Sequence, residues 1–256
     1  MLRPRLIPCL LIHKGGLVKT VQFGSPKYVG DPLNAVRIFN EKEVDELMVI
    51  DIDASRNGVP PNEKLIAEMA AECRMPLCYG GGVKSADMID RLVSLGVEKV
   101  AVGSAAVENT ALVTEAARRV GNQSVVVVID VKSSGILRRQ EVVTYNGTKR
   151  TSLDPVTFAR QVQDLGAGEI VINSVDRDGK MQGYDLALAA KVRAATSIPL
   201  TVLGGAGTID DVRALIAQHP VIGAAAGSLF VFKGKFRAVL INYPDRAERD
   251  LLAAAS

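Results

Sequence analysis

The strongest constraint on the fold is an alternation that runs through the whole 256-residue chain. Short apolar runs, rich in Val, Ile and Leu, alternate with stretches in which apolar residues recur every three or four positions. The first pattern predicts buried strands and the second predicts amphipathic helices. Eight strand-like runs are found, at residues 6–12, 47–51, 76–79, 99–103, 124–130, 169–174, 199–203 and 221–226.

The helical pattern is clearest in NEKLIAEMAAEC, SADMIDRLVSLG, DPVTFARQVQDLG and TIDDVRALIAQ. Eight βα units in a chain of this length are typical of a TIM barrel. We therefore predict that residues 1–256 form one α/β domain, a (βα)8 barrel. A doubly wound open sheet is the alternative, but it usually carries a phosphate-binding fingerprint after its first strand. The corresponding turn here, HKGGLVK, matches that fingerprint poorly.

A second regularity divides the chain into two similar halves. MPLCYGGGVKSADMIDRLVSLG resembles IPLTVLGGAGTIDDVRALIAQH, which aligns Gly81-Gly82 with Gly204-Gly205. AVGSAAV resembles AAGSLFV in the same way, so Gly103-Ser104 aligns with Gly227-Ser228. Internal similarity of this kind predicts a duplicated architecture. We expect two half-barrels of four units each, at approximately residues 1–120 and 121–256.

The repeat also gives the first strand a counterpart in the second half. IPCLLIHK aligns with VVVIDVKS, so Leu11 stands where the other half carries Asp130. A carboxylate at a strand end in a barrel mouth is a candidate general acid or base. The alternative for Asp130 is a capping or turn residue.

Glycine pairs at the predicted strand ends suggest anion binding. Their backbone N–H groups, together with the N-terminus of the helix that follows, attract phosphate. DRDG, residues 176–179, adds another turn after the sixth strand. Each half of the chain carries one set of these glycines, and the two sets together predict a ligand with a phosphate at each end. The alternative is that the glycines only satisfy tight turns. Lys19 is expected in the loop that follows the glycines after strand one, where its side chain either reaches over the mouth or is solvated.

Composition and charge exclude several other classes. The net charge is +3 with no dense basic block, so we expect no nucleic-acid surface. Cys9, Cys73 and Cys78 fit neither a zinc cluster nor a disulfide framework, and we expect buried thiols in a reducing cytoplasm. With only two histidines we expect no metal site and no cofactor. Neither a signal peptide nor a transmembrane run is found, so we expect a cytoplasmic protein away from membranes.

As an ensemble, these motifs carry a family resemblance. The sequence resembles the HisF-like cyclase subunit of imidazole glycerol phosphate synthase, a histidine-pathway enzyme, over nearly the full chain. The resemblance rests on RLIPCL, DELMVIDIDAS, GGGVKS, EKVAVGSAAVEN, VVVIDVK, LGAGEIVINSVDRDG and LGGAG. It implies a duplicated half-barrel, a substrate with two phosphates, and a lyase or cyclase type of reaction. It also implies a glutaminase subunit docked at the N-terminal face, whose ammonia travels through the barrel.

The resemblance assigns roles to particular residues. It implies that Arg5, Glu46, Lys99 and Glu169 form the charged ring at the ammonia entrance, for which a purely structural salt-bridge cluster is the alternative. The candidate phosphate-binding residues are Gly81, Gly82, Gly103, Ser104, Asp178, Gly179, Gly204, Gly205, Gly227 and Ser228. Ordinary cyclases tend to have Asn where this chain has Gly103. They tend to have an Ala-rich segment where this chain has AGS. Asp130 corresponds to one of the family's two catalytic aspartates, and Leu11 occupies the position of the other.

Leu11 bears directly on function, because leucine neither donates nor accepts a proton. We therefore expect low cyclase activity, and we do not assign His13, two residues further on, to the missing role. The first hypothesis is a WbuZ-like paralogue that passes ammonia to a sugar amidotransferase making an acetamidino sugar for surface lipopolysaccharide. The alternative is the histidine-pathway cyclase itself, which converts ammonia and a bisphosphorylated ribosylamino-imidazolecarboxamide into imidazole glycerol phosphate and AICAR. A barrel isomerase or another sugar-phosphate enzyme is a third hypothesis.

Overall fold

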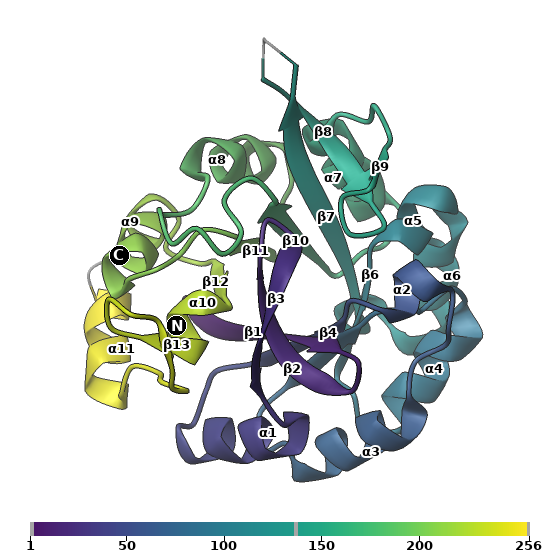
Figure 1. The fold of residues 1–256 in the computed structure, drawn as a ribbon. Helices are drawn as coiled ribbons and strands as arrows, with labels where there is room; N and C mark the ends of the chain where they lie inside the picture. The colour runs from purple at the N-terminus through teal and green to yellow at the C-terminus, as the bar shows by residue number, and fades with distance from the viewer. Residues whose placement is uncertain (1–2, 136–137, 255–256) are drawn as a thin grey trace.

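Eight parallel strands close into a barrel in the computed structural model, which describes residues 3–135 and 138–254 (Figure 1). The strands are β1 (Arg5–His13), β4 (Leu47–Asp51), β5 (Leu77–Gly80), β6 (Lys99–Val102), β7 (Val125–Ser134), β10 (Glu169–Ser174), β11 (Leu200–Leu203) and β12 (Gly223–Ala226). Pairing of β1 with β12 and of β7 with β10 completes the circle. The predicted barrel is confirmed, and the open sheet is excluded because it would leave two unpaired edges.

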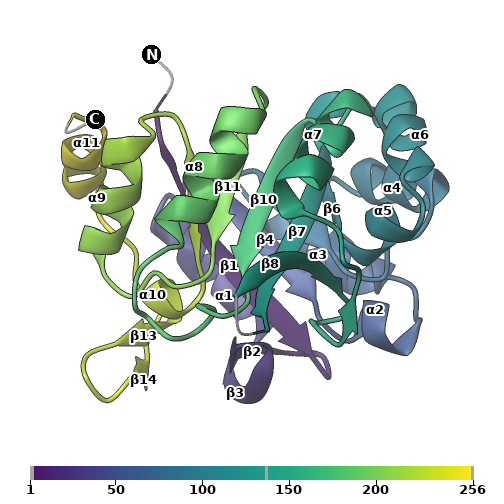
Figure 2. The same ribbon diagram turned by 90° about the horizontal axis from the view of Figure 1, so that it is seen from above.

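A helix follows each barrel strand and packs outside it (Figures 1 and 2). These helices are α1 (Pro32–Glu41), α3 (Glu63–Glu72), α4 (Ala86–Ser94), α6 (Ala111–Val120), α7 (Pro155–Asp164), α8 (Leu186–Ala195), α9 (Ile209–Gln218) and α11 (Arg246–Ala254). The four helical sequence patterns begin at N-caps: the side chains of Asn62, Ser85, Asp154 and Thr208 each accept a backbone N–H bond from the first turn. None of the described helices is long and apolar enough to cross a membrane.

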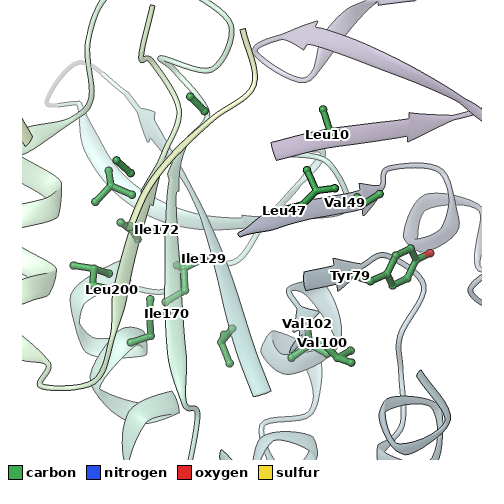
Figure 3. Close-up of a cluster of buried hydrophobic side chains, with 14 of the residues drawn as sticks. Leu10, Leu47, Val49, Tyr79, Val100, Val102, Ile129, Ile170, Ile172 and Leu200 are labelled. Carbon is green, nitrogen blue, oxygen red and sulfur yellow. The ribbon is translucent and has the colours of Figure 1, made fainter. Parts of the chain in front are cut away.

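The strands send alternate side chains to two separate apolar cores. In β1, Leu6 and Leu10 join the large cluster between the strands and the helices, part of which Figure 3 shows. Ile7 and Cys9 join a smaller cluster inside the barrel, and Leu11 packs against it from above. Arg5 lies two residues before Ile7 in the same strand, so its side chain also points into the barrel interior. The strand pattern therefore orders the interior from Arg5 at the bottom to Leu11 at the top.

Two β-hairpins rise from the barrel mouth and were not predicted. β1 continues into an antiparallel pair with β2 (Gly16–Val21), which pairs with β3 (Gly24–Gly30). β7 likewise continues into an antiparallel pair with β8 (Arg139–Thr144), which pairs with β9 (Lys149–Arg150). Smaller elements complete the chain: α2 (Ala54–Asn57), α5 (Ser104–Glu108), η1 (Asn122–Ser124), α10 (Ser228–Val231), β13 (Phe232–Lys233) and β14 (Ala238–Val239). Each half thus carries a hairpin after its first strand and a short helix after its fourth.

Candidate functional site

A cavity of about 110 Å³ lies at the carboxyl ends of the strands and is lined from both halves of the barrel. Its apolar wall is formed by Cys9, Leu11, Phe23, Met48, Ile50, Ile52, Ala101, Val128 and Leu203. Its polar groups come from Thr20, Asp51, Ser55, Ser104, Asp130, Asn146 and Asn173. Carboxyl ends of strands are where TIM barrels place their chemistry. We refer to this cavity as the mouth.

Asp130 is a half-buried carboxyl group that lines the mouth. It lies beside Asn173 of the neighbouring strand β10. The Nδ2 of Asn173 donates a 2.8 Å hydrogen bond to Oδ1 of Asp130. Burial raises the pKa of Asp130 to about 6, although the bond from Asn173 favours the charged form. A carboxyl group with a pKa near neutrality can both hold and release a proton under physiological conditions.

Leu11 occupies the equivalent position in the first half. It pairs with Ile50 of β4 and with Val18 of the hairpin strand β2. Asp130 likewise pairs with Asn173 of β10 and with Val143 of β8. The two registers therefore match as the sequence repeat predicted. They also show that Ile50 stands where the other half has Asn173, so both members of the polar pair are apolar here.

Asp51 is another carboxylate that lines the mouth, and sequence reasoning missed it. It directly follows Ile50, and its Oδ1 accepts bonds from the backbone N–H groups of Asp53 and Ala54 at 2.9 and 3.0 Å. Burial raises its pKa, while these two bonds oppose the rise. His13 lies outside the mouth lining and its Nδ1 is 2.8 Å from Asp53 Oδ1. His13 therefore does not replace the family aspartate.

The first-half phosphate candidates Gly81, Gly82, Gly103 and Ser104 line one small pocket next to the mouth. The hydroxyl of Ser104 accepts a 3.0 Å bond from the backbone N–H of Tyr145. Gly81 has a φ of 113°, and a Cβ there would lie 2.3 Å from the carbonyl oxygen of Asp51. This glycine is thus required by the turn itself. At Gly103 a Cβ would meet nothing closer than 3.5 Å, so the fold leaves room for a side chain there.

The second-half candidates line a matching pocket: Asp178, Gly179, Gly204, Gly205, Gly227 and Ser228. Lys19 enters this pocket from β2, and its Nζ donates to Asp178 Oδ1 and to the carbonyl oxygen of Thr20, both at 2.8 Å. Lys19 is buried, so the solvated alternative is wrong, and it lies in a strand rather than in a loop. Because the Asp178 carboxylate is bonded to Lys19 and Thr20, it orients that cation and is not itself an anion ligand.

Ser228 differs from its first-half equivalent in one respect. Its hydroxyl is buried and has no hydrogen-bond partner among the described residues. Buried polar groups are normally paired. An unpaired hydroxyl in a pocket of glycine turns is a donor available to a ligand oxygen.

The two hairpins cross to the opposite halves and cover the mouth. The backbone N–H of Gln22 donates to the carbonyl oxygen of Asp178 at 3.0 Å, and Asn146 Nδ2 donates to that of Ile52 at 2.7 Å. The hairpin tips also meet, since a Cβ built on Gly147 would lie 3.4 Å from the ring of Phe23. Phe23 and Asn146 both line the mouth. A ligand would therefore be enclosed by parts of both halves.

The opposite end of the barrel is closed by the four predicted charges, which we call the ring. Arg5 bonds Glu46 and, at 2.7 Å, Glu169. Lys99 Nζ donates to Glu46 at 2.8 Å and to Glu169 at 2.9 Å. Thr201 adds a 2.6 Å bond to Glu169. Each cation thus bridges both acids, in the arrangement that best offsets the cost of burying them.

The electrostatics of the ring follow from this pairing. Burial would raise the pKa of Glu169, but Arg5 and Lys99 outweigh it and lower that pKa. For Glu46, burial and the nearby charge of Glu169 dominate and raise the pKa. Below the ring lies a groove of about 800 Å³ whose lining includes Arg3, Arg5, Lys99, Glu169 and Val221. Above it the interior is apolar, formed by Ile7, Cys9, Met48, Cys78, Ala101, Val126, Val171 and Ala225.

The cysteines and the acidic groups give no sign of a metal centre in the described part of the chain. Cys9, Cys73 and Cys78 are free thiols, and burial raises the pKa of Cys73 to about 11. Within residues 3–135 and 138–254, no group of three or more His, Cys, Asp or Glu side chains is arranged to hold a metal ion.

Comparison with known proteins places these features in context. Residues 5–237 match the family model described as "Histidine biosynthesis protein". The chain is 56% identical over 249 residues to the "Putative imidazole glycerol phosphate synthase subunit hisF3" of Vibrio vulnificus, covering 97% of this chain and 96% of the relative. It is 54% identical over 252 residues to a protein of Leptospira borgpetersenii named "Putative imidazole glycerol phosphate synthase subunit HisF", covering 98% and 99%. The "Imidazole glycerol phosphate synthase subunit HisF" of Limosilactobacillus fermentum is 38% identical over 233 residues, covering 91% and 89%.

Proposed function

Because this chain belongs to the HisF-like family of imidazole glycerol phosphate synthase subunits, we propose that it is the barrel partner of a glutaminase and that it passes ammonia to a separate acceptor enzyme. Its own cyclase activity is then low. The observation that carries this proposal is a contrast within one barrel. The ring at the bottom has all four charges paired, whereas the mouth has Leu11 and Ile50 in place of a second polar pair.

The ring and the interior support ammonia passage on physical grounds. The two cations and the two acids of the ring neutralise one another, so the ring gives ammonium no net attraction. Neutral ammonia loses little by leaving water for the apolar interior, whereas a charged ion loses a great deal. The groove below the ring offers a concave surface at the N-terminal face, where we propose that the glutaminase docks.

The mouth supports binding more than it supports chemistry. The two glycine pockets, with Lys19 in one and the unpaired hydroxyl of Ser228, fit a phosphorylated small molecule. Asp130 offers one proton-transfer group with a pKa of about 6. Ring closure to an imidazole moves protons at more than one centre, and Leu11 supplies no group for the second transfer.

We propose that the acceptor is a sugar amidotransferase that makes an acetamidino sugar for surface lipopolysaccharide, and that the complex works in the cytoplasm. One observation favours the second candidate, the histidine-pathway cyclase. Asp130 and Asp51 both line the mouth, and the two glycine pockets lie beside it. If Asp51 supplied the second proton transfer, the barrel would close the imidazole ring itself.

The test compares the cyclase activity of the protein with its ability to bind and support a glutaminase. The protein is incubated with ammonium salt and the bisphosphorylated histidine-pathway substrate, and imidazole glycerol phosphate is measured. In parallel it is mixed with its candidate glutaminase, and complex formation and glutamine hydrolysis are measured. We expect a stable complex and negligible imidazole product. Robust turnover with ammonium would overturn the passage proposal in favour of the cyclase, and failure to form the complex would remove the glutaminase partner.

A further inference from the structure

The hairpin β13–β14 projects from the same face of the barrel as the mouth hairpin β2–β3 (Figure 2). At its tip Phe236 is 87% exposed, and Leu240, which follows β14, is 51% exposed. Val239 and, from the neighbouring hairpin, Val21 are also exposed. Large apolar side chains gathered in this way on a folded surface mark an interaction site more often than single exposed residues do.

Contacts join the two hairpins that carry these side chains, beside the mouth. Lys27 of β3 donates to the carbonyl oxygen of Arg237 at 3.0 Å and lies 4.9 Å above the ring of Phe232. Arg237 Nη1 lies 3.5 Å from the carbonyl oxygen of Gly179, which lines the second phosphate pocket. Val21 packs on Gly179 as well, because a Cβ built there would lie 3.1 Å from Val21 Cγ2. The two hairpins and the edge of the mouth are thus continuous.

All the charges that these two segments carry have the same sign. Residues 232–240 contain Lys233, Lys235 and Arg237, and residues 21–30 contain Lys27; neither segment contains Asp or Glu. Around the exposed apolar side chains the local charge is therefore +4, counted from those four cations, while the whole chain has only +3. Such a surface attracts a partner with acidic groups around an apolar patch.

We propose that this hairpin surface, defined by Val21, Phe236, Val239 and Leu240 with the four cations, docks the ammonia acceptor as an acidic protein partner. The inference rests on the proposed function, which requires an acceptor close to the place where ammonia leaves. The surface is contiguous with the mouth and lies at the opposite end of the barrel from the ring. A glutaminase below the ring and an acceptor on the hairpin surface can therefore bind at the same time.

The experiment uses the full-length protein, its candidate glutaminase, and a purified sugar amidotransferase from the same organism as the probe. Binding of the amidotransferase is measured by calorimetry for wild type, for Phe236→Ser with Leu240→Ser, and for Lys233→Glu with Lys235→Glu. Leu251→Ser is the matched control, because Leu251 is 72% exposed but lies on α11. We expect both double variants to weaken binding by roughly tenfold or more, and the control to leave it unchanged. We also expect rising salt to weaken wild-type binding.

Glutaminase binding separates the possible failures. All variants should bind the glutaminase as wild type does, which shows that they fold. If the amidotransferase binds wild type and both double variants equally, the hairpin surface is wrong and the proposed function stands. If the amidotransferase binds neither wild type nor any variant, both the proposed acceptor and the assignment of the hairpin surface are wrong. Phe236-dependent binding to phosphatidylglycerol vesicles, or Phe236-dependent dimerisation in sedimentation, with amidotransferase affinity unchanged, would reassign the surface to a membrane or to a second copy.

Discussion

The two halves of the barrel offer the same backbone frame at the mouth and fill it differently. In the second half, Asp130 and Asn173 stand side by side, joined by a 2.8 Å hydrogen bond. In the first half, Leu11 and Ile50 take the equivalent positions in register. The hairpins, the glycine turns and the short helices are present in both halves. Proton-transfer capacity at these positions is thus set by two side chains, independently of the fold that holds them.

The largest expected effect comes from restoring the first-half carboxylate. Leu11→Asp should raise cyclase turnover with ammonium by about 10²-fold or more, because a positioned proton-transfer group contributes that much. Leu11→Asn is the matched control, since it is polar and of similar size but transfers no proton at neutral pH. Equal rates for the two variants, or a fast wild type, would show that the halves do not differ in the way proposed.

The next effect tests the burial of Asp130. Its pKa is raised from 3.8 to about 6, so the folded state binds the proton more tightly than the unfolded state does. The resulting penalty is absent below the unfolded pKa, grows as pH rises, and is complete above the folded pKa. Asp130→Asn, which keeps an acceptor for Asn173, should therefore stabilise the protein by about 2–3 kcal/mol at pH 8 and have little effect near pH 4.

Urea unfolding of wild type and Asp130→Asn across this pH range measures that difference. A stability gain that is the same at both pH values would mean that Asp130 is not titrating between them. A loss of stability at pH 8 would mean that its carboxylate is favoured by the fold. Either result would remove the contrast between a carboxyl group that is costly to ionise in one half and an apolar pair in the other.

A smaller effect should follow from completing the polar pair. Adding Ile50→Asn to Leu11→Asp supplies the donor that Asn173 gives to Asp130. A hydrogen bond to a charged group contributes about 1.5–3 kcal/mol, so the double variant should exceed the single variant by roughly tenfold in cyclase rate. Ile50→Leu in the same background is the control for a change of shape alone. No gain from Asn over Leu would show that the acid acts without a partner.

The smallest effect distinguishes the two serines. Ser104→Ala removes the acceptor of the Tyr145 N–H and should cost about 1 kcal/mol of unfolding free energy without ligand. Ser228→Ala removes no observed bond and should be nearly neutral in the same measurement. With inorganic phosphate present, stabilisation by the ligand should be weaker in Ser228→Ala than in wild type. Equal phosphate stabilisation would show that the Ser228 hydroxyl does not contact the anion.

The sequence predicted the barrel well because its signals are local and repeated. The eight apolar runs and the capped helical patterns coincide with strands and helices to within a few residues, apart from the extended end of β7. The equivalence of Leu11 and Asp130 could also be predicted, because the internal repeat aligns the strands of one half with those of the other. The mouth hairpins were missed because β1 and β7 turn from parallel to antiparallel pairing within one continuous strand, which leaves no local break in the pattern.

The contacts of individual side chains were less predictable. Lys19 pairs with Asp178 across 159 positions of the chain, a contact that no local pattern encodes. Asn173 and Asp51 follow apolar runs in INS and IDI, and aligning these segments with the repeat would have drawn attention to both. The ring was named through family resemblance, and its pairing depends on four strands meeting at one end of a closed barrel.

The most direct test of ammonia passage uses isotopes. The glutaminase, the barrel and the acceptor amidotransferase are given glutamine labelled with ¹⁵N in its amide, in a solution containing excess unlabelled ammonium. We predict that the wild-type complex places mainly ¹⁵N in the product. Lys99→Met, verified as folded by its melting curve and its glutaminase binding, should bring the label toward the proportion in solution. A wild-type product that already has the label content of the bulk solution would contradict ammonia passage through this barrel.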